Sequence, residues 1–375
     1  GVQTCALPIY LERLLFDRRR ITTCQNGQPM PTVTFSFPLR SLTLNRKFDK
    51  YPFVPQDTND RTARAEEILT MQATGLAGRL RHTHARTVVG LSGGLDSALA
   101  LLVICRAYDM LGLSRRDIHT VTMPCFGTTG RTLGNARTLA QATGTTLHEI
   151  DIALAVRQHL ADIGHDETTL DVTYENAQAR ERTQVLMDIA NKYGALVIGT
   201  GDLSELALGW ATYNGDHMSM YGVNASVPKT LVRYLVDHEA RRIGGETGHA
   251  LFDILATPVS PELLPPKDGE ISQQTEELVG PYMLHDFFLY YMIRFGFPPA
   301  KIYRIACETF ADETTPAVIK HWLQTFVRRF FAQQFKRSCL PDGPKVGSVT
   351  LSPRGDWRMP SDAVATLWLQ QLEEL

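Results

Sequence analysis

Short apolar runs alternate with longer amphipathic segments through the middle of the chain. The apolar runs predict buried strands, because each spans four or five residues and is bounded by polar or glycine-rich residues. These runs are Thr87 to Leu91, Thr120 to Met123, Leu147 to Ile150 and Ala195 to Ile198. The segments between them predict helices over about 97–110, 133–143 and 177–193. This alternation predicts an α/β fold, a doubly wound parallel sheet of about five strands with helices on both faces.

The flanking segments have weaker patterns. Residues 51–55, Tyr-Pro-Phe-Val-Pro, predict a rigid extended connector, and a helix is expected over about 62–81. After Leu231 the periodicity weakens, and prolines punctuate a loop over 258–266. A helical region is expected from about Met283 to Phe335, followed by an irregular tail rich in glycine and proline from Cys339.

Composition excludes several classes of protein. Apolar residues make up 43% of the 375 residues, and no stretch approaches the roughly 18 uninterrupted apolar residues of a membrane helix. The formal net charge of −2 gives no basis for binding nucleic acid or a membrane surface. The six cysteines include no CxxC pair and no zinc spacing, so we expect reduced thiols in a cytoplasmic protein.

The strongest chemical signal is the segment Ser-Gly-Gly-Leu-Asp-Ser at 92–97, here called the phosphate loop. It lies between a predicted strand and a predicted helix. Glycines let backbone N–H groups turn toward an anion, and the helix N-terminus adds further unpaired donors. Asp96 would be repelled by phosphate unless a divalent cation lay between them, which indicates Mg²⁺. No lysine follows the second glycine, so this is not a Walker motif.

Two later blocks, YENAQARER at 174–182 and GTGDLSELALGWATYNGDHMSMYGVNASVPK at 199–229, narrow the function. Together with the phosphate loop they resemble glutamine-dependent NAD synthetase, a member of the ATP pyrophosphatase (PP-loop) family with an adenine nucleotide α-hydrolase-like fold. The resemblance runs from about Phe48 to the end. It implies ATP-dependent amidation of nicotinic acid adenine dinucleotide to NAD through an acyl adenylate, with release of AMP and pyrophosphate.

The resemblance also implies site residues. It assigns the ATP site to Gly90, Leu91, Ser92, Gly93, Gly94, Leu95, Asp96, Ser97, Met123, Thr200 and Lys229. It assigns the dinucleotide site to Asn176, Arg182, Glu205, Trp210, Ala211, Thr212, Tyr213, Asp216 and Lys336. Asp96 and Glu205 would hold Mg²⁺, and no residue need act as a nucleophile, because positioning and charge neutralisation can supply the rate.

Several of these residues also have purely structural interpretations. Arg182 and Asn176 could point toward one substrate, although an arginine on a helix is usually solvated. The aromatic run Trp210 to Tyr213 could stack on a nicotinate ring or pack under a loop. The segment 209–223 has too little pattern for a helix or strand, which is typical of a lid. Ammonia-dependent members of the family carry a lysine near Tyr213, so substrate contacts transfer least directly here.

The family implies that glutamine supplies ammonia through a separate nitrilase-like domain, whose Glu, Lys and Cys we cannot place in this chain. Residues 1–9 resemble a translated sequencing adapter and are expected to be non-native, and residues 10–49 to be a remnant of that domain and a linker. Residues 50–375 are then the synthetase domain, with a helical part over 282–338 and an irregular tail over 339–375. We expect NAD formation with ammonium chloride but not glutamine, and a homo-oligomer.

Two other functions remain open on the sequence. One is another amidating PP-loop enzyme, such as a guanylate or asparagine synthetase, which assays with xanthylate and aspartate would distinguish. The other is a nucleotide-sensing module without turnover, although the presence of both Asp96 and Glu205 favours an active site.

Overall fold

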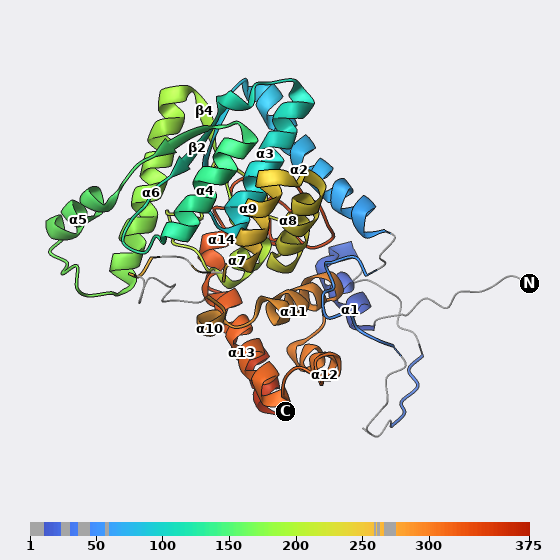
Figure 1. Ribbon diagram of the computed structural model, residues 1–375. Coiled ribbons are helices and arrows are strands. Elements are labelled where there is room, and N and C mark those ends of the chain that lie inside the picture. Colours follow the sequence, from blue (N-terminus) through green and yellow to red (C-terminus); the bar gives the residue numbers. More distant parts are fainter. Residues whose placement is uncertain are drawn as a thin grey trace, which may run out of the picture.

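The computed structural model describes residues 11–23, 31–36, 46–56, 60–258, 260, 263–265 and 275–375. The segment 1–9, expected to be non-native, lies outside the described residues, as does part of the expected remnant at 10–49. Figure 1 shows a sheet covered by helices, with a second group of helices beside it that belongs to the C-terminal part of the chain.

The sheet has five strands in the order β3-β2-β1-β4-β5, and every neighbouring pair is parallel. The strands are β1 (Arg86–Gly90), β2 (Ile118–Thr122), β3 (Thr146–Glu149), β4 (Ala195–Gly199) and β5 (Tyr221–Gly222). The four apolar runs of the sequence are β1 to β4, displaced by at most two residues. The predicted α/β class and five-stranded parallel sheet are confirmed.

The helices follow the strands along the chain. Those up to the end of the sheet region are α1 (Leu11–Arg20), α2 (Arg61–Thr83), α3 (Leu95–Leu111), α4 (Gly130–Thr143), α5 (Ala153–Asp162), α6 (Val172–Tyr193), α7 (Leu203–Leu208), α8 (Lys229–Ile243) and α9 (Gly245–Ala256). The later ones are α10 (Thr275–Val279), α11 (Tyr282–Phe295), α12 (Pro299–Thr309), α13 (Pro316–Ala332), α14 (Gln334–Arg337) and α15 (Thr366–Glu373). No described helix is both long enough and apolar enough to cross a membrane.

Neighbouring residues of β1 face two separate hydrophobic cores. Val89 packs with α2, α3, α4, α8 and α9 on one face of the sheet, and Val88 packs with α5 and α6 on the other. This alternation follows from the two-residue period of a strand, and burial on both faces explains why the strands read as continuous apolar runs.

A third core holds the C-terminal helices together and joins them to the sheet. It contains Leu203 and Leu208 of α7, aromatic residues of α11 and α13, and Leu372 of α15. Phe287, Phe288, Phe326 and Phe330 are fully buried in it. Helix α7 therefore packs against the C-terminal helices while it leads out of β4, which places the C-terminal region next to the carboxyl end of the sheet.

Four local predictions differ from the structure. The expected extended connector forms a turn, in which Val54 N–H donates to the Tyr51 carbonyl at 3.0 Å. Segment 209–223, expected to lack regular structure, ends in the two-residue strand β5, which pairs with β4. Two helices, α8 and α9, fill the region after Leu231 where the pattern weakened. The tail, expected to be irregular, contains α15, held by the burial of Leu372.

Candidate active site

The phosphate loop lies at the carboxyl end of β1, between the ends of β2 and β4. The chain passes from β1 to β2 on one side of it and later enters β4 on its other side, so the strand order reverses at β1. Ligands bind at such a reversal point in open α/β sheets. Leu91 N–H donates to the Val121 carbonyl at 2.8 Å, so the loop starts in register with β2.

Backbone geometry explains the glycine pair of the loop. Gly93 has φ +81°, and a Cβ atom there would lie 2.0 Å from the Thr132 carbonyl oxygen. Gly94 is the N-cap of α3 in extended conformation. Its N–H donates to Ser92 Oγ at 3.2 Å, and Ser97 Oγ lies 3.1 Å from Ser92 Oγ. The turn therefore gathers two hydroxyls and the amide end of α3 in one small space, which suits a phosphate oxygen.

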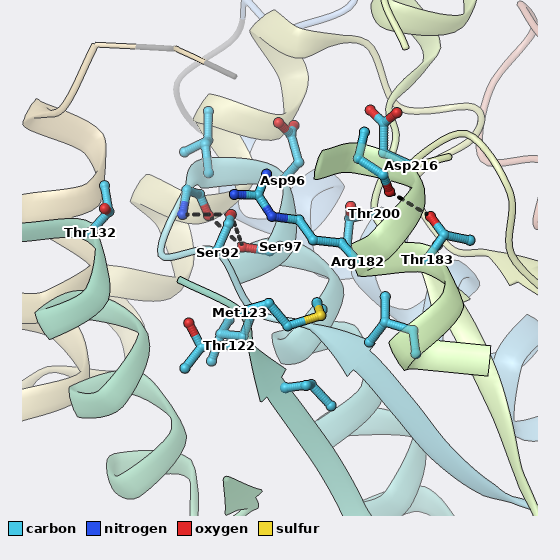
Figure 2. A pocket seen from close by; sticks show the side chains of 18 of the residues that line it. Ser92, Asp96, Ser97, Thr122, Met123, Thr132, Arg182, Thr183, Thr200 and Asp216 are labelled. Atoms are coloured by element: carbon cyan, nitrogen blue, oxygen red, sulfur yellow. Dashed lines mark hydrogen bonds between the residues drawn. The ribbon is translucent and has the colours of Figure 1, made fainter. Parts of the chain in front are cut away.

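A pocket of about 270 Å³ opens over this loop. It collects residues from the ends of β1, β2 and β4 and from α6, as Figure 2 shows for Ser92, Asp96, Met123, Arg182 and Thr200. Predicted site residues in its wall are Gly90, Leu91, Ser92, Gly94, Leu95, Asp96, Ser97, Met123, Arg182, Thr200, Glu205 and Asp216. Predicted residues up to 126 positions apart in the sequence, Gly90 and Asp216, thus line one cavity.

Lys229 is the centre of a buried ionic cluster beside this pocket. Its Nζ lies 2.6 Å from Asp96 Oδ2, 2.8 Å from Asp202 Oδ2 and 2.8 Å from Glu205 Oε1. Only 5% of the Lys229 side chain is exposed, and none of the Asp202 side chain. Lys229 is the first residue of α8, so the start of that helix aims the ammonium at the carboxylates. We call Lys229, Asp96, Asp202 and Glu205 the acidic site.

Burial and mutual charge shift the protonation equilibria of the acidic site. Burial raises the pKa of Glu205 to about 7, against the lowering effect of Lys229. Burial likewise raises the pKa of Asp202 well above its usual range. Although burial alone would lower the pKa of Lys229, the carboxylates of Asp202, Asp96 and Glu205 hold it well above its usual range. The lysine therefore stays charged and offsets part of the negative charge.

The donor set of the acidic site fits a magnesium ion. Carboxylate oxygens of Asp96, Asp202 and Glu205 lie within 4.8 Å of one another. Asp96 Oδ1 is buried and has no hydrogen-bond partner among the described residues, so this oxygen can serve as a ligand. Hard carboxylate oxygens are the protein ligands that Mg²⁺ prefers.

Asn224 and Asp286 form hydrogen bonds that link the helices and strand ends that carry the acidic site. Asn224 Nδ2 donates to the carbonyls of Asp96 and Thr200 at 3.0 and 3.1 Å, and so joins the first turn of α3 to the end of β4. Asp286 of α11 accepts from Thr230 N–H at 3.0 Å and from the Ser204 hydroxyl. Ser204 Oγ in turn accepts from Lys229 N–H at 2.8 Å.

A second pocket of about 80 Å³ lies between segment 209–226 and the C-terminal tail. It shares Gly199, Thr200, Glu205 and Asp216 with the larger pocket. Of the remaining predicted substrate residues, Ala211 lines this smaller space. The two pockets therefore adjoin each other at these shared residues, which include Glu205.

Other predicted substrate residues contact protein groups. Asn176 accepts from the Thr212 hydroxyl at 2.7 Å, whereas Arg182 lines the larger pocket, so these two side chains do not share one environment. Tyr213 stacks on His217 with ring centroids 5.1 Å apart. Trp210 packs against the third core, with the Arg329 guanidinium 5.2 Å from its ring.

Lys336 also contacts protein groups. Its Nζ donates to the carbonyls of Gly209 and Ala211 at 2.9 and 2.5 Å. Its role in dinucleotide binding stays a prediction.

Sequence reasoning missed Asp202, Asn224 and Asp286. A signal for Asp202 was present, because Asp202 and Glu205 have the spacing of a capping box, and the structure contains one: Glu205 N–H donates to Asp202 Oδ1 at 2.8 Å. The roles of Asn224 and Asp286 depend on contacts across 128 and 82 sequence positions, which no local pattern encodes. Arg180, which donates to the Tyr213 carbonyl at 3.3 Å, was also missed.

Comparison with known proteins adds sequence relatives. Residues 68–249 match a family model described as NAD synthase. The glutamine-dependent NAD(+) synthetase of Mycobacterium tuberculosis (strain ATCC 25618 / H37Rv) is 44% identical, over 100% of this chain and 60% of the relative. That of Mycobacterium leprae (strain TN) is 43% identical, over 92% of this chain and 55% of the relative. The chain thus spans about 60% of the length of these relatives.

Solved structures support the fold. A glutamine-dependent NAD(+) synthetase from Cytophaga hutchinsonii superimposes with a TM-score of 0.67 at 19% identity, covering 83% of this chain and 56% of that one. An NH3-dependent NAD synthetase from Campylobacter jejuni gives a TM-score of 0.50 at 20% identity, covering 72% and 95%. The phosphate loop and the acidic site lie inside the segment matched by sequence, and the chain therefore carries, at residues 68–249, a domain of the NAD synthase family.

Proposed function

We propose that this chain catalyses the ATP-dependent amidation of nicotinic acid adenine dinucleotide to NAD, with ammonia that the whole protein obtains from glutamine. One observation carries the proposal: an NAD synthase domain brings the phosphate loop and the carboxylates of Asp96 and Glu205 to one pocket beside Lys229. A phosphate-binding loop and a buried cation can stabilise the charge that develops in an adenylation reaction, and a pair of carboxylates can hold a metal ion there.

In the first step a carboxylate oxygen of the nicotinate ring attacks the α phosphorus of ATP, and the bond from that phosphorus to the bridging oxygen breaks. Pyrophosphate leaves and an acyl adenylate remains. The phosphate loop binds the departing phosphates through the amide end of α3 and the hydroxyls of Ser92 and Ser97. Met123 and Thr200 line the same pocket and are assigned to ATP, and Arg182 adds a cation to its wall.

Asp96 and Glu205 would hold Mg²⁺, with Asp202 close behind them. When bound, the ion neutralises phosphate oxygens and so favours departure of pyrophosphate. Lys229 already contacts all three carboxylates, which keeps them in place for the ion. Its ammonium adds positive charge where pyrophosphate develops negative charge.

In the second step ammonia attacks the carbonyl carbon of the acyl adenylate, the carbon–oxygen bond to AMP breaks, and the nitrogen loses a proton to give the amide. None of this requires a protein nucleophile, since bound reactants at short distance supply the advantage. The smaller pocket meets the larger one at Glu205 and Asp216, and we assign the dinucleotide to this junction.

An isotope experiment tests the adenylate directly. The chain is incubated with ATP, Mg²⁺, ammonium chloride and deamido dinucleotide labelled with ¹⁸O in its nicotinate carboxylate. We expect NAD, AMP and pyrophosphate in equal amounts, with one ¹⁸O atom in the AMP phosphate. Label in pyrophosphate or ADP formation would contradict the mechanism, and turnover of xanthylate or aspartate in its place would indicate a different amidating enzyme.

A pair of variants ties turnover to the site. Asp96→Ala should abolish pyrophosphate release and leave the fold intact, as judged by circular dichroism. Asp109→Ala removes an exposed carboxylate that pairs with Arg115 and should retain full release. Activity in Asp96→Ala would refute the metal assignment, and the absence of release from the unaltered chain would favour a nucleotide-sensing module. Sedimentation of the unaltered chain tests whether it forms the expected homo-oligomer.

A further inference from the structure

Three basic side chains converge on the C-terminal end of α7. Arg337 Nη1 donates to the carbonyls of Leu206 and Ala207 at 3.2 and 3.0 Å. Arg329 Nε donates to the Leu208 carbonyl at 3.0 Å, and Lys336 Nζ donates to the next carbonyls, those of Gly209 and Ala211. We call Arg329, Lys336 and Arg337 the basic triad; all three come from the end of α13 and from α14.

The position of the basic triad follows from the carbonyls of α7 that have no hydrogen-bond partner within the helix. The last four carbonyls of a helix have no partner within it, and cations near them are favoured by the helix dipole. Helix α7 has only six residues, so most of its carbonyls are of this kind. Gly209 ends it with φ +60°, and a Cβ there would lie 2.2 Å from Gln333 Cβ. The end of α7 is thus pressed against the end of α13.

Arg337 is the least exposed of the triad, at 1%. Its other hydrogen bonds go to Gln334 Oε1 at 3.0 Å and to the Phe330 carbonyl, and its guanidinium lies 4.2 Å from the Phe330 ring centroid. These partners are uncharged, and burial lowers the pKa of Arg337 to about 9. Burying a cation without a carboxylate is costly. A merely structural contact at this point could be apolar, so the charge indicates a need for directed hydrogen bonds.

The opposite end of α7 carries two members of the acidic site. Asp202 is its N-cap and Glu205 lies in its first turn. At a rise of about 1.5 Å per residue, α7 is about 9 Å long. The contacts at its C-terminal end therefore lie within two turns of both carboxylates and help to set the direction of the helix that carries them.

We infer that Arg337 is a positioning residue for the reaction. By holding the Leu206 and Ala207 carbonyls, it fixes α7 so that Asp202 and Glu205 meet Asp96 around Lys229. The kinetic part of this inference rests on the proposed function, and its structural part does not.

The structural arm measures hydrogen exchange of the amides in 203–211 by mass spectrometry, without substrate. Arg337→Met should accelerate exchange in this segment, and Arg337→Lys, which keeps the charge but loses the planar guanidinium, should do so less. Arg106→Met is the matched control, because Arg106 is partly buried and binds Glu66 and Glu239 outside both pockets. Unchanged exchange in 203–211 for both Arg337 variants would overturn the inference.

The kinetic arm uses the same proteins with ATP, deamido dinucleotide and ammonium chloride. Per folded molecule, Arg337→Met should lower kcat by about 10- to 100-fold, since misplacing a catalytic group by about 1 Å has such effects. The KM for ATP should stay within about three-fold, because the phosphate loop is untouched. Arg337→Lys should recover part of the loss, and Arg106→Met should keep its kcat.

The outcomes distinguish a purely structural role of Arg337, a variant that does not fold and a failure of the proposed function. If Arg337→Met lowers the melting temperature and leaves kcat unchanged, Arg337 is structural only and the inference is wrong. If Arg337→Met does not fold, Arg337→Lys decides alone, and an unchanged kcat in that variant contradicts the positioning role. If the unaltered chain makes no NAD, the proposed function fails, and the exchange arm still decides whether Arg337 holds α7.

Discussion

The ammonium of Lys229 lies 2.6 Å from Asp96 Oδ2, where a carboxylate expected to bind a metal ion meets a lysine expected to bind phosphate. The two expectations are compatible because Asp96 has a second oxygen, Oδ1, that is buried and unpaired among the described residues. Lys229 thus contributes twice: it holds three carboxylates together and keeps positive charge beside the phosphate loop.

Replacing Lys229 by methionine should damage both stability and activity. Three buried or half-buried carboxylates would lose their cation, and breaking a buried ion pair by removing one partner costs about 3 to 5 kcal/mol. We expect a loss of that order in the free energy of unfolding, measured in urea, and no measurable pyrophosphate release. Lys50→Met is the control, since Lys50 pairs with Asp312 and Glu313 on the surface. A Lys229→Met protein of unaltered stability would contradict the ionic cluster.

The two glycines of the phosphate loop should differ in their tolerance of a methyl group. Gly93→Ala places a Cβ 2.0 Å from the Thr132 carbonyl at φ +81°, so the loop must move. We expect loss of ATP binding by calorimetry and a lower melting temperature. Gly94→Ala meets only Ser92 Oγ at 3.3 Å in extended backbone, and its effect should be small. Equal effects of the two substitutions would show that the loop conformation is not the one described.

Stability should fall in mild acid because of a histidine pair. His119 Nδ1 lies 3.0 Å from His148 Nε2, and both rings contact Tyr193. Burial, with the neighbouring His148, lowers the pKa of His119, and burial, with Lys192, lowers the pKa of His148. A folded-state pKa below the unfolded value means that the stabilisation is full above about pH 6.5 and is lost as pH falls through the folded value.

The measurement is the free energy of unfolding between pH 7.5 and pH 5. A protein with His119→Asn and His148→Gln together should lose stability less steeply over this range. His249→Gln, at an exposed position, should follow the unaltered chain. A steep dependence that persists in the double variant would place its origin elsewhere.

Substitution of Asp286 should impair the acidic site, although Asp286 is not among the residues assigned to ATP, the dinucleotide or Mg²⁺. It accepts from Thr230 N–H at 3.0 Å and from the Thr230 hydroxyl at 2.6 Å, and so secures the first turn of α8. Asp286→Ala leaves the part-buried Thr230 N–H without this acceptor, which costs about 1 to 3 kcal/mol. We expect that loss in urea unfolding together with a reduced kcat, and a smaller loss in Asp286→Asn, which keeps one acceptor oxygen. A larger effect of asparagine than of alanine would refute this account.

How far the sequence predicted the structure depends on the range of the interactions involved. The strand and helix pattern is local, and β1 to β4 with α2, α3, α4 and α6 were all predicted to within five residues at either end. Strand β5 was missed because two residues, Tyr221 and Gly222, cannot form a recognisable alternation. Helices α8 and α9 were missed although their buried residues lie on one face, as Leu231, Val232, Leu235 and Val236 do in α8, so a helical pattern was present in the sequence.

Site prediction had the same limit. The phosphate loop could be predicted because a short motif encodes it, and Glu205 was assigned through the family resemblance. Asp286 and Arg337 lie on helices that only tertiary packing brings near the site, and their side chains look ordinary in their own segments. Lys336 and Arg337 lie at a helix end, where cations are common. The carbonyls they bind belong to α7 and to the residues just after it, more than 120 positions away.

The order of these residues along the chain has a consequence for synthesis on the ribosome. Asp96, Asp202 and Glu205 are made before Lys229, and Lys229 before Asp286 and Arg337. A nascent chain that has emerged only as far as Gly222 already contains every strand of the sheet, yet its three carboxylates have no cation. Such a chain would keep these acids in water and would not close the site. Completion of the acidic site is therefore delayed until Lys229 has emerged, and the supporting contacts of Asp286 and Arg337 form only when the C-terminal helices follow.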